Sequence, residues 1–332
     1  MLATVGVLLV AIAVILVGCE LFTNGVEWFG RHLKLGDGSV GSILAAVGTA
    51  LPETIVPVIA IILGTGQDAQ SIGIGAIVGS SFMLATLALF VTGLSVAVFS
   101  LLGHRSRRVK ADPVVLARDL RFFVVAYGAT IVAALLDRRE VKLALALALV
   151  AAYAVYVYRT VAGDEESGHD LRRLYFHPRS DVPHVVPVAV QMLSALAIIV
   201  VGARFFVEGV EGAAQALAVP ALVFSLLVTP FATELPEKLN SVLWVRQGKD
   251  TLALGNITGA MVFQACVLPA IGILLTPWEL TTPALVAATL GLVSAGAAYA
   301  QVRIRGSLSH RHLIAMGLLY VGFAGYAFRL AA

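Results

Sequence analysis

Long apolar segments alternate with short polar connections along almost the whole chain. A helix that crosses a bilayer needs about 20 mostly apolar residues, and ten segments meet this criterion. They lie near residues 2–24, 39–64, 71–99, 119–136, 141–160, 184–207, 217–245, 251–275, 281–301 and 311–330. Because lipid offers no partners to unpaired backbone groups, each segment is expected to be an α-helix. The pattern therefore predicts an all-α polytopic membrane protein with ten transmembrane helices.

The composition points the same way. Hydrophobic residues make up 59% of the chain and charged residues 13%, and the mean hydropathy is +0.93. A soluble domain carries roughly 25% charged residues, so this chain has too few to cover a water-facing surface. The first segment lacks the basic region and the cleavage site of a signal peptide, and we expect it to be retained as a span. Cys19 and Cys266 lie in apolar segments without metal-type spacing, and we expect both to be buried small residues.

Lysine and arginine are concentrated in the connections that follow the first, third, fifth, seventh and ninth segments. Seventeen of the 23 lie there: Arg31, Lys34, Arg105, Arg107, Arg108, Lys110, Arg118, Arg121, Arg159, Arg172, Arg173, Arg179, Arg246, Lys249, Arg303, Arg305 and Arg311. The other connections and the C-terminal end hold Arg138, Arg139, Lys142 and Arg329. Basic connections stay in the cytoplasm, so both termini are expected outside, in a bacterial or archaeal inner membrane. The basic residues thus mark topology, and no nucleic-acid partner is expected.

The two halves of the chain repeat each other. The stretch GCELFTNGVE at 18–27 resembles GARFFVEGVE at 202–211, and the Pro-Glu pair at 52–53 recurs at 236–237, each with an offset of 184. A third match, GAIVGSSF and GNITGAMVF, begins at Gly75 and Gly255, with an offset of 180. Because each half holds five spans, an odd number, the second half enters the membrane from the opposite side. We therefore predict two inverted five-helix repeats, 1–160 and 184–332, joined by a cytoplasmic linker at 161–183.

The repeated Pro-Glu pair places carboxylates in the middle of apolar segments. Pro52 and Pro236 cannot donate to a helical ladder, and Pro230 adds a second predicted break in the seventh segment. An intramembrane carboxylate normally faces an internal pathway, so Glu53 and Glu237 are expected to meet near the midplane. With the hydroxyls of Thr49, Thr233 and Ser80 they form an all-oxygen set, which suits a hard divalent cation. The alternative is that each Pro-Glu pair only kinks a packed helix.

At these residues the chain resembles the calcium/cation antiporter superfamily, which includes the sodium/calcium exchangers. GTALPE at 48–53 and ATELPE at 232–237 are similar to the family motif GTSLPE, and the Gly75 and Gly255 stretches are similar to its GN-x-x-GSN element. The resemblance implies a pocket between segments 2, 3, 7 and 8, across which segments 1 and 6 slide. It also implies a ligand set, namely the side chains of Thr49, Glu53, Thr233, Glu237 and Ser80 and the carbonyls of Ala46 and Pro230.

The chain departs from the family pattern at several pocket positions. Where the family motif has serine, the two repeats have Ala50 and Glu234. The counterpart of Ser80 in the second repeat is Ala260. Where the family has further polar residues later in segments 3 and 8, this chain has Leu84 and Gln264. These positions help to build sodium sites in sodium-coupled members, so the resemblance leaves sodium coupling open.

Glu234 also has two possible roles. It lies four residues before Lys238, the favourable order for a helical ion pair, and this pairing is our preferred interpretation. Alternatively, Glu234 faces the cation as a third carboxylate and carries protons. A second pair of repeat mates, Glu20 and Arg204, is expected to find local partners and not to form a latch between segments 1 and 6.

These observations predict a secondary-active antiporter that exchanges Ca²⁺, or a similar divalent cation, for Na⁺ or H⁺ by alternating access. The alternatives are a proton-coupled Ca²⁺ exchanger without sodium sites, and a divergent cation channel or membrane scaffold. We expect no enzymatic activity and no cofactor. The expected partners are inorganic cations and the lipid bilayer, and the protein is expected to act as a monomer.

Overall fold

The computed structural model describes residues 2–32, 50–64, 68–161, 172–180 and 182–331, and all regular structure in these ranges is helical. The elements are α1 (Leu2–His32), α4 (Leu51–Leu63), α5 (Ala69–Met83), the π-helix η2 (Leu84–Ala88), α6 (Leu89–Leu101), α7 (Pro113–Ala134), α8 (Arg139–Val161), α9 (Val185–Ala216), α10 (Ala221–Arg246), α11 (Asp250–Leu275), α12 (Thr282–Arg305) and α13 (His310–Ala331). The predicted all-α class is therefore confirmed. Every predicted span overlaps a helix, and residues 39–49 of the second span lie outside the described ranges.

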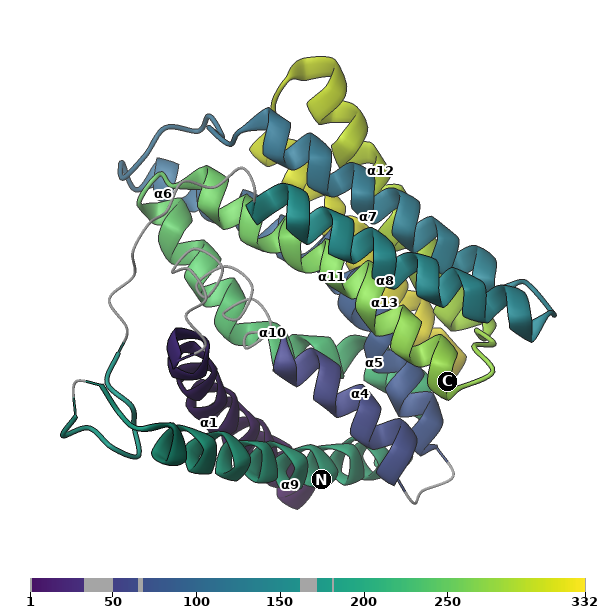
Figure 1. The fold of residues 1–332 in the computed structure, drawn as a ribbon. Helices are drawn as coiled ribbons and strands as arrows, with labels where there is room; N and C mark the ends of the chain where they lie inside the picture. The colour runs from purple at the N-terminus through teal and green to yellow at the C-terminus, as the bar shows by residue number, and fades with distance from the viewer. Residues whose placement is uncertain (1, 33–49, 65–67, 162–171, 181, 332) are drawn as a thin grey trace.

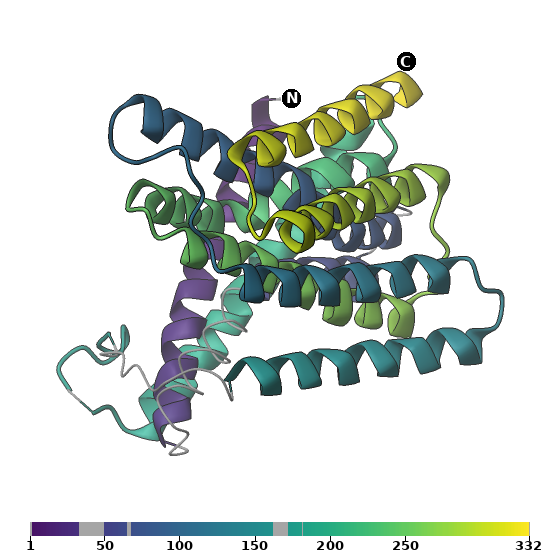
Figure 2. The same ribbon diagram turned by 90° about the horizontal axis from the view of Figure 1, so that it is seen from above.

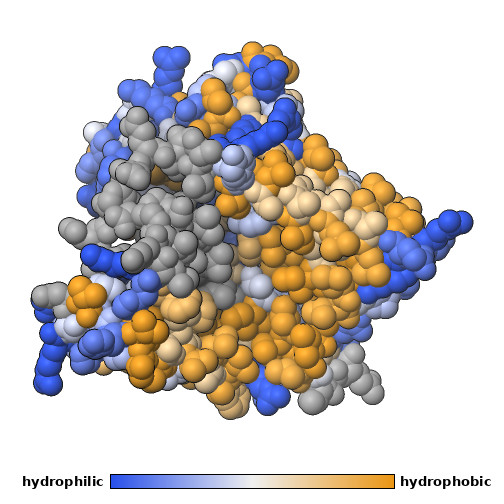
Figure 3. All heavy atoms as spheres, in the orientation of Figure 1, coloured by the Kyte–Doolittle hydropathy of each residue, from blue (hydrophilic) through white to orange (hydrophobic). Residues whose placement is uncertain are grey.

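The helices have the length and surface of membrane spans. Within the described residues, six helical stretches are long and apolar enough to cross a bilayer: Val5–Phe29, Ala69–Leu101, Arg139–Thr160, Val185–Ala216, Asp250–Leu275 and Thr282–Arg305. Large apolar side chains such as Leu147 and Leu318 are exposed. Figure 3 shows hydrophobic residues across the middle of one face and hydrophilic residues at its left and right margins. A surface of this kind fits a protein that is integral to a membrane.

The helices form two groups with separate hydrophobic cores. The larger core lies among α5 to α8 and α10 to α13, whereas the smaller one lies among α1, α4 and α9, with residues of α5 and α10 at its edge. Figures 1 and 2 both show α1 beside α9, and Figure 1 shows this pair on the opposite side of the molecule from α7, α8 and α12. The two groups meet where α4 packs against α5 and α5 packs against α10. The predicted cation site falls in this junction.

The contact between α1 and α9 has a local two-fold symmetry. A Cβ atom added to any of four glycines would lie 2.6 to 2.9 Å from a side chain of the other helix. The pairs are Gly18 with Ile199, Gly202 with Ile15, Gly25 with Met192, and Gly209 with Leu8. All four glycines come from the first repeated motif. The two contacts in each set are related by the offset of 184: Gly18 and Ile199 correspond to Gly202 and Ile15, and Gly25 and Met192 correspond to Gly209 and Leu8. Small residues at these positions let the two helices approach closely, as in other membrane helix pairs.

The described part of the linker is folded against α1. Trp28 Nε1 donates a hydrogen bond of 2.9 Å to the Arg172 carbonyl, and Tyr175 Oη donates one of 2.7 Å to Glu20 Oε1. Arg172 also pairs with Glu20 at 3.3 Å. In the described residues Glu20 thus has its partners in the linker, as expected for a residue that does not form a latch with Arg204. The linker therefore holds the end of α1 on which the first repeated motif lies.

The predicted breaks in the seventh segment are wrong, because α10 is one helix through both Pro230 and Pro236. Pro230 has no N–H for the Leu226 carbonyl, and this carbonyl instead faces the backbone of α5. A Cβ atom added to Gly79 would lie only 2.4 Å from Leu226 O. The close approach of α5 therefore shields the carbonyl that the proline leaves free.

Candidate cation site

The first carboxylate of the site stands at the beginning of α4. The helix starts at Leu51, directly before Pro52, and Thr54 Oγ1 closes the first turn by donating a 2.7 Å hydrogen bond to the Ala50 carbonyl. A proline is well placed in a first turn, because the N–H groups there have no helical partner. Glu53 follows in that turn and is only 3% exposed. The positive end of the helix dipole favours a negative charge at this position.

The second group of predicted site residues lies in the middle of α10. Pro230, Thr233 and Glu234 are all buried, and Glu234 is 0% exposed. Thr233 Oγ1 donates to the carbonyls of Thr229 at 3.1 Å and Pro230 at 3.4 Å, which are acceptors one turn earlier. In this structure the Pro230 carbonyl therefore already accepts a hydrogen bond from another predicted ligand.

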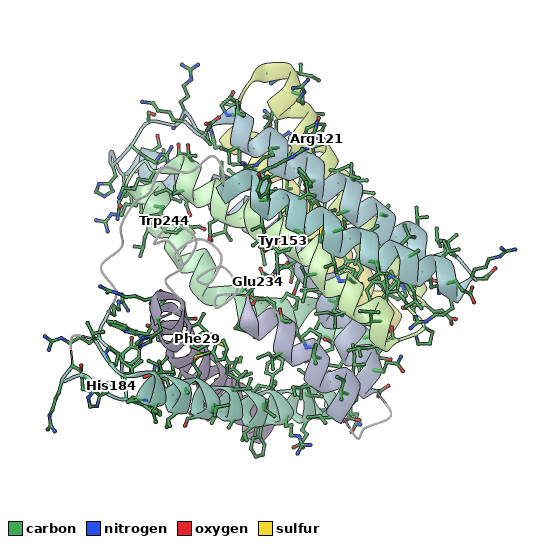
Figure 4. All side chains as sticks on the ribbon, in the orientation of Figure 1. Phe29, Arg121, Tyr153, His184, Glu234 and Trp244 are labelled. Atoms are coloured by element: carbon green, nitrogen blue, oxygen red, sulfur yellow. The ribbon has the colours of Figure 1, made fainter. Side chains whose placement is uncertain are left out.

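Glu234 is hydrogen-bonded to another residue of the predicted pocket, Gln264. Gln264 Nε2 on α11 donates a 3.0 Å hydrogen bond to Glu234 Oε1, and both side chains are buried. In Figure 4, Glu234 is drawn near the beginning of α4, a helix that α10 contacts. The structure therefore brings Glu234 into the region of the predicted pocket, and its described hydrogen bond is to α11.

α5 contributes buried hydroxyl groups beside a distortion of its helix. Ser80, the predicted ligand, is 2% exposed, and Ser81 is fully buried. The helix continues as η2, a five-residue π-helical insertion that begins at Leu84. Such insertions are frequent at functional sites. Within the described residues, neither Ser81 Oγ nor Gln264 Oε1 has a hydrogen-bond partner, so two buried neutral oxygens are available to a ligand.

Several predicted site residues cannot be placed. Ala46 and Thr49 lie outside the described residues, and so do the side chains of Glu237 and Lys238, although their backbone belongs to α10. The meeting of Glu53 with Glu237, and the ion pair between Glu234 and Lys238, therefore remain predictions. In the described part of the chain, no three His, Cys, Asp or Glu side chains gather as a metal cluster. A cation bound here would rely on carboxylates together with neutral oxygens.

Comparison with known proteins identifies the family. The family model of the sodium/calcium exchanger proteins matches residues 3–162 and 188–329, nearly the whole chain. The chain belongs to this family of antiporters. The resemblance inferred from the two Pro-Glu motifs is therefore confirmed, and the two matched segments coincide closely with the predicted halves.

Several known proteins resemble the chain over most of its length. The inner membrane protein YrbG of Escherichia coli K12 is 26% identical over 84% of this chain and 82% of its own. The crystal structure of the H⁺/Ca²⁺ exchanger CAX has a TM-score of 0.75 at 18% identity, covering 96% of this chain and 80% of that one. The sodium-calcium exchanger NCX_Mj has a TM-score of 0.57 at 21% identity, covering 96% and 97%. The fold is therefore that of the exchanger family.

A further buried carboxylate, Asp119, binds the repeated stretch that begins at Gly255. Asp119 on α7 is 1% exposed and accepts hydrogen bonds from Thr258 Oγ1 at 2.8 Å, Arg118 Nε at 3.0 Å and Tyr156 Oη at 3.1 Å. Thr258 belongs to the stretch GNITGAMVF. Asp119 thus ties α11 to α7 and α8. The sequence analysis missed this residue, although an acid at the start of the predicted span 119–136 was a usable signal.

Replacing Asp119 with alanine is expected to destabilise the protein by about 2 kcal/mol, because the buried Thr258 and Tyr156 hydroxyls lose a charged acceptor. The midpoint of thermal unfolding of the purified protein would measure the loss. Asp137→Ala is the control, since Asp137 is an exposed acid in the connection that follows the same helix. Equal midpoints for the two variants would show that Asp119 does not hold α11 in place.

Proposed function

We propose that this protein is a secondary-active antiporter that exchanges Ca²⁺, or a similar divalent cation, for protons by alternating access. The observation that carries the proposal is the pair of buried carboxylates, Glu53 and Glu234, on α4 and α10, two helices in contact in a chain of the exchanger family. Two negative charges among neutral oxygens match one hard divalent cation. The expected equivalence of Glu237 with Glu53 would add a further carboxylate to the site.

The buried carboxylates also explain why exchange is favoured over leak. Carrying a net charge through an apolar environment is costly. A bound divalent cation, or protons on the carboxylates, would cancel this charge and allow the loaded site to pass an apolar barrier. The empty and fully ionised site would not pass. Transport in one direction is therefore coupled to transport in the other.

Protons are favoured over sodium as the counter-ion by the residues near the site. Leu84 and Ala260 offer no side-chain oxygen, and Gln264 uses its amide nitrogen to hold Glu234. At Leu84 and Ala260 the chain thus lacks side-chain oxygens, at positions that help to build sodium sites in the family, and Gln264 offers only a neutral oxygen. A buried carboxylate, in contrast, can take up a proton when the divalent cation leaves. Solved structures of similar fold include both an H⁺/Ca²⁺ exchanger and a sodium-calcium exchanger, so the fold accommodates either counter-ion.

The inverted organisation is part of the proposal. It is supported by the two-fold contact of α1 with α9 and by successive connections that lie at opposite ends of the helices. In Figure 1 the α6–α7 connection lies at the left of the molecule and the α7–α8 connection at the right. The arginine-rich connections would face the cytoplasm, with both termini outside. Alternating access would then arise from movement of α1 and α9 relative to the rest, around a site fixed near the midplane.

Flux measurements on the purified protein in liposomes test the proposed function. We expect ⁴⁵Ca²⁺ uptake when a proton gradient is imposed, and none when a sodium gradient of equal size replaces it. Uptake driven by sodium alone would overturn proton coupling. Cation conductance that needs no counter-ion would indicate a channel, and the absence of both flux and Ca²⁺ binding would indicate a scaffold.

A further inference from the structure

A basic cavity lies between the beginning of α7 and the end of α12, well away from the cation site. Its volume is about 400 Å³. The α7 side consists of Pro113, Val114, Ala117, Arg118 and Arg121, and the α12 side consists of Tyr299, Val302 and Arg303. Figure 4 shows Arg121 on α7, in the upper part of the molecule where α7 and α12 are drawn. Three guanidinium groups from two helices therefore line one hollow.

Two of these three charges are not compensated within the described residues. Arg118 pairs with Asp119 at 3.0 Å, and its charge is therefore balanced. Arg121 and Arg303 are exposed, and neither has a carboxylate partner in the part of the chain that the structure describes. The nearby Asp112 caps α7 by accepting a hydrogen bond from the Val114 N–H at 2.7 Å. Even with the carboxylates of Asp112 and Asp119 counted, the three guanidinium groups leave an excess of positive charge at the cavity, and planar guanidinium groups suit the oxygens of a phosphate.

The surroundings of the cavity are apolar and exposed. On the same two helices, Val114 is 74% exposed, Val125 68% and Ile304 81%. In a membrane protein such side chains contact acyl chains, so the cavity lies where lipid-facing helix surfaces meet the arginine-rich end. The proposed topology puts this end in the cytoplasm, and basic pockets between helices on the cytoplasmic side of a membrane bind anionic lipid headgroups. A free phosphate would use the arginines but would gain nothing from the apolar surface beside them.

We propose that this cavity binds an anionic phospholipid, with the lipid phosphate on Arg121 and Arg303 and the acyl chains along the exposed faces of α7 and α12. The assignment rests on residues outside the cation site. It therefore holds whichever counter-ion drives exchange, and binding can be measured without transport.

The test is a lipid titration of the delipidated full chain in detergent, read by native mass spectrometry. Phosphatidylglycerol is expected to bind more tightly than phosphatidylcholine. The double variant R121Q/R303Q should bind phosphatidylglycerol about thirtyfold more weakly, because each arginine near a lipid surface contributes about 1 kcal/mol and about 1.4 kcal/mol is tenfold. The matched control is R107Q/R108Q, which removes two exposed arginines of the α6–α7 connection that do not line the cavity. Its affinity should stay at that of the parent chain.

Three outcomes would overturn the proposal. An equal loss of affinity in R107Q/R108Q would mean that general surface charge, and not this cavity, attracts the lipid. Equal binding of phosphatidylcholine would remove the need for a net negative headgroup. Displacement of the lipid by millimolar inorganic phosphate would mean that the acyl chains add nothing. A photoactivatable phosphatidylglycerol gives a second measurement on the unmodified protein, with crosslinks expected in the peptides that contain Val114 and Ile304.

Discussion

Glu53→Gln is expected to lower Ca²⁺ exchange at least about 100-fold while leaving the fold intact. Glutamine has almost the same shape, so the first turn of α4 should survive, but one of the charges that balance a divalent cation is lost. At an effective dielectric constant of about 20, each unit-charge pair at about 4 Å contributes about 4 kcal/mol, and the cation carries two charges. Because Glu53 is 3% exposed, water can replace little of this attraction. Counter-ion-driven ⁴⁵Ca²⁺ flux in proteoliposomes measures the change.

Glu140→Gln is the matched control. Glu140 is also an acid in the first turn of a helix, but it lies on α8 and is exposed. Its loss should leave the flux unchanged. Wild-type flux in Glu53→Gln, with the variant protein folded, would remove Glu53 from the site, whereas a loss in both variants would point to a general effect of acidic residues.

Gly79→Ala is expected to separate α5 from α10 and to destabilise the protein by about 3 kcal/mol, the upper end of the usual cost of overpacking. The added Cβ would lie 2.4 Å from Leu226 O and 2.9 Å from Leu226 C and Cα. These are backbone atoms of a helix, so no side-chain rotation can relieve the contact. The separation would also expose the carbonyl that Pro230 leaves free. Thermal unfolding of the purified protein gives the stability, and the flux assay should show a parallel loss.

The second repeat supplies the control for this prediction. Gly259 is the counterpart of Gly79, and the nearest described atom to an added Cβ there is Tyr156 Oη, at 3.6 Å. Gly259→Ala should therefore keep the stability of the parent protein, or raise it, since alanine is the better helix former. Equal losses in Gly79→Ala and Gly259→Ala would mean that the tight contact with Leu226 does not govern the α5–α10 packing.

The hydrophobic pattern predicted the helical class and the approximate helix positions because transmembrane helices need long apolar segments. It did not predict that α10 continues through Pro230, where the Leu226 carbonyl lies against Gly79, about 150 residues earlier in the chain. The close approach of one backbone to another leaves no periodic signal in either segment. Helix ends were also underestimated: α9 continues to Ala216, beyond the predicted end at 207, because its last turns pack on α1.

The candidate site could be predicted in outline from paired motifs, but not in its contacts. Glu234 was noted as an unusual acid, and its helical spacing favoured Lys238 as a partner. A hydrogen bond also joins Glu234 to Gln264 on another helix, and tertiary neighbours of this kind are not encoded in spacing. Asp119 was missed for a related reason, since its meaning comes from Thr258 and Tyr156, which reach it from two other helices.

The two-fold contact between α1 and α9 has a consequence for how this molecule could diversify. Four glycines that meet side chains in self-complementary pairs make an isologous interface, the kind that two copies of one polypeptide form when they dimerise. In such a dimer every substitution would appear in both copies of the cation site's residues at once. Within a single chain that constraint is lifted. One repeat can carry Ala50 and Leu84 while the other carries Glu234 and Gln264, so the selectivity of the cation site can change in one repeat while the other keeps its ligands.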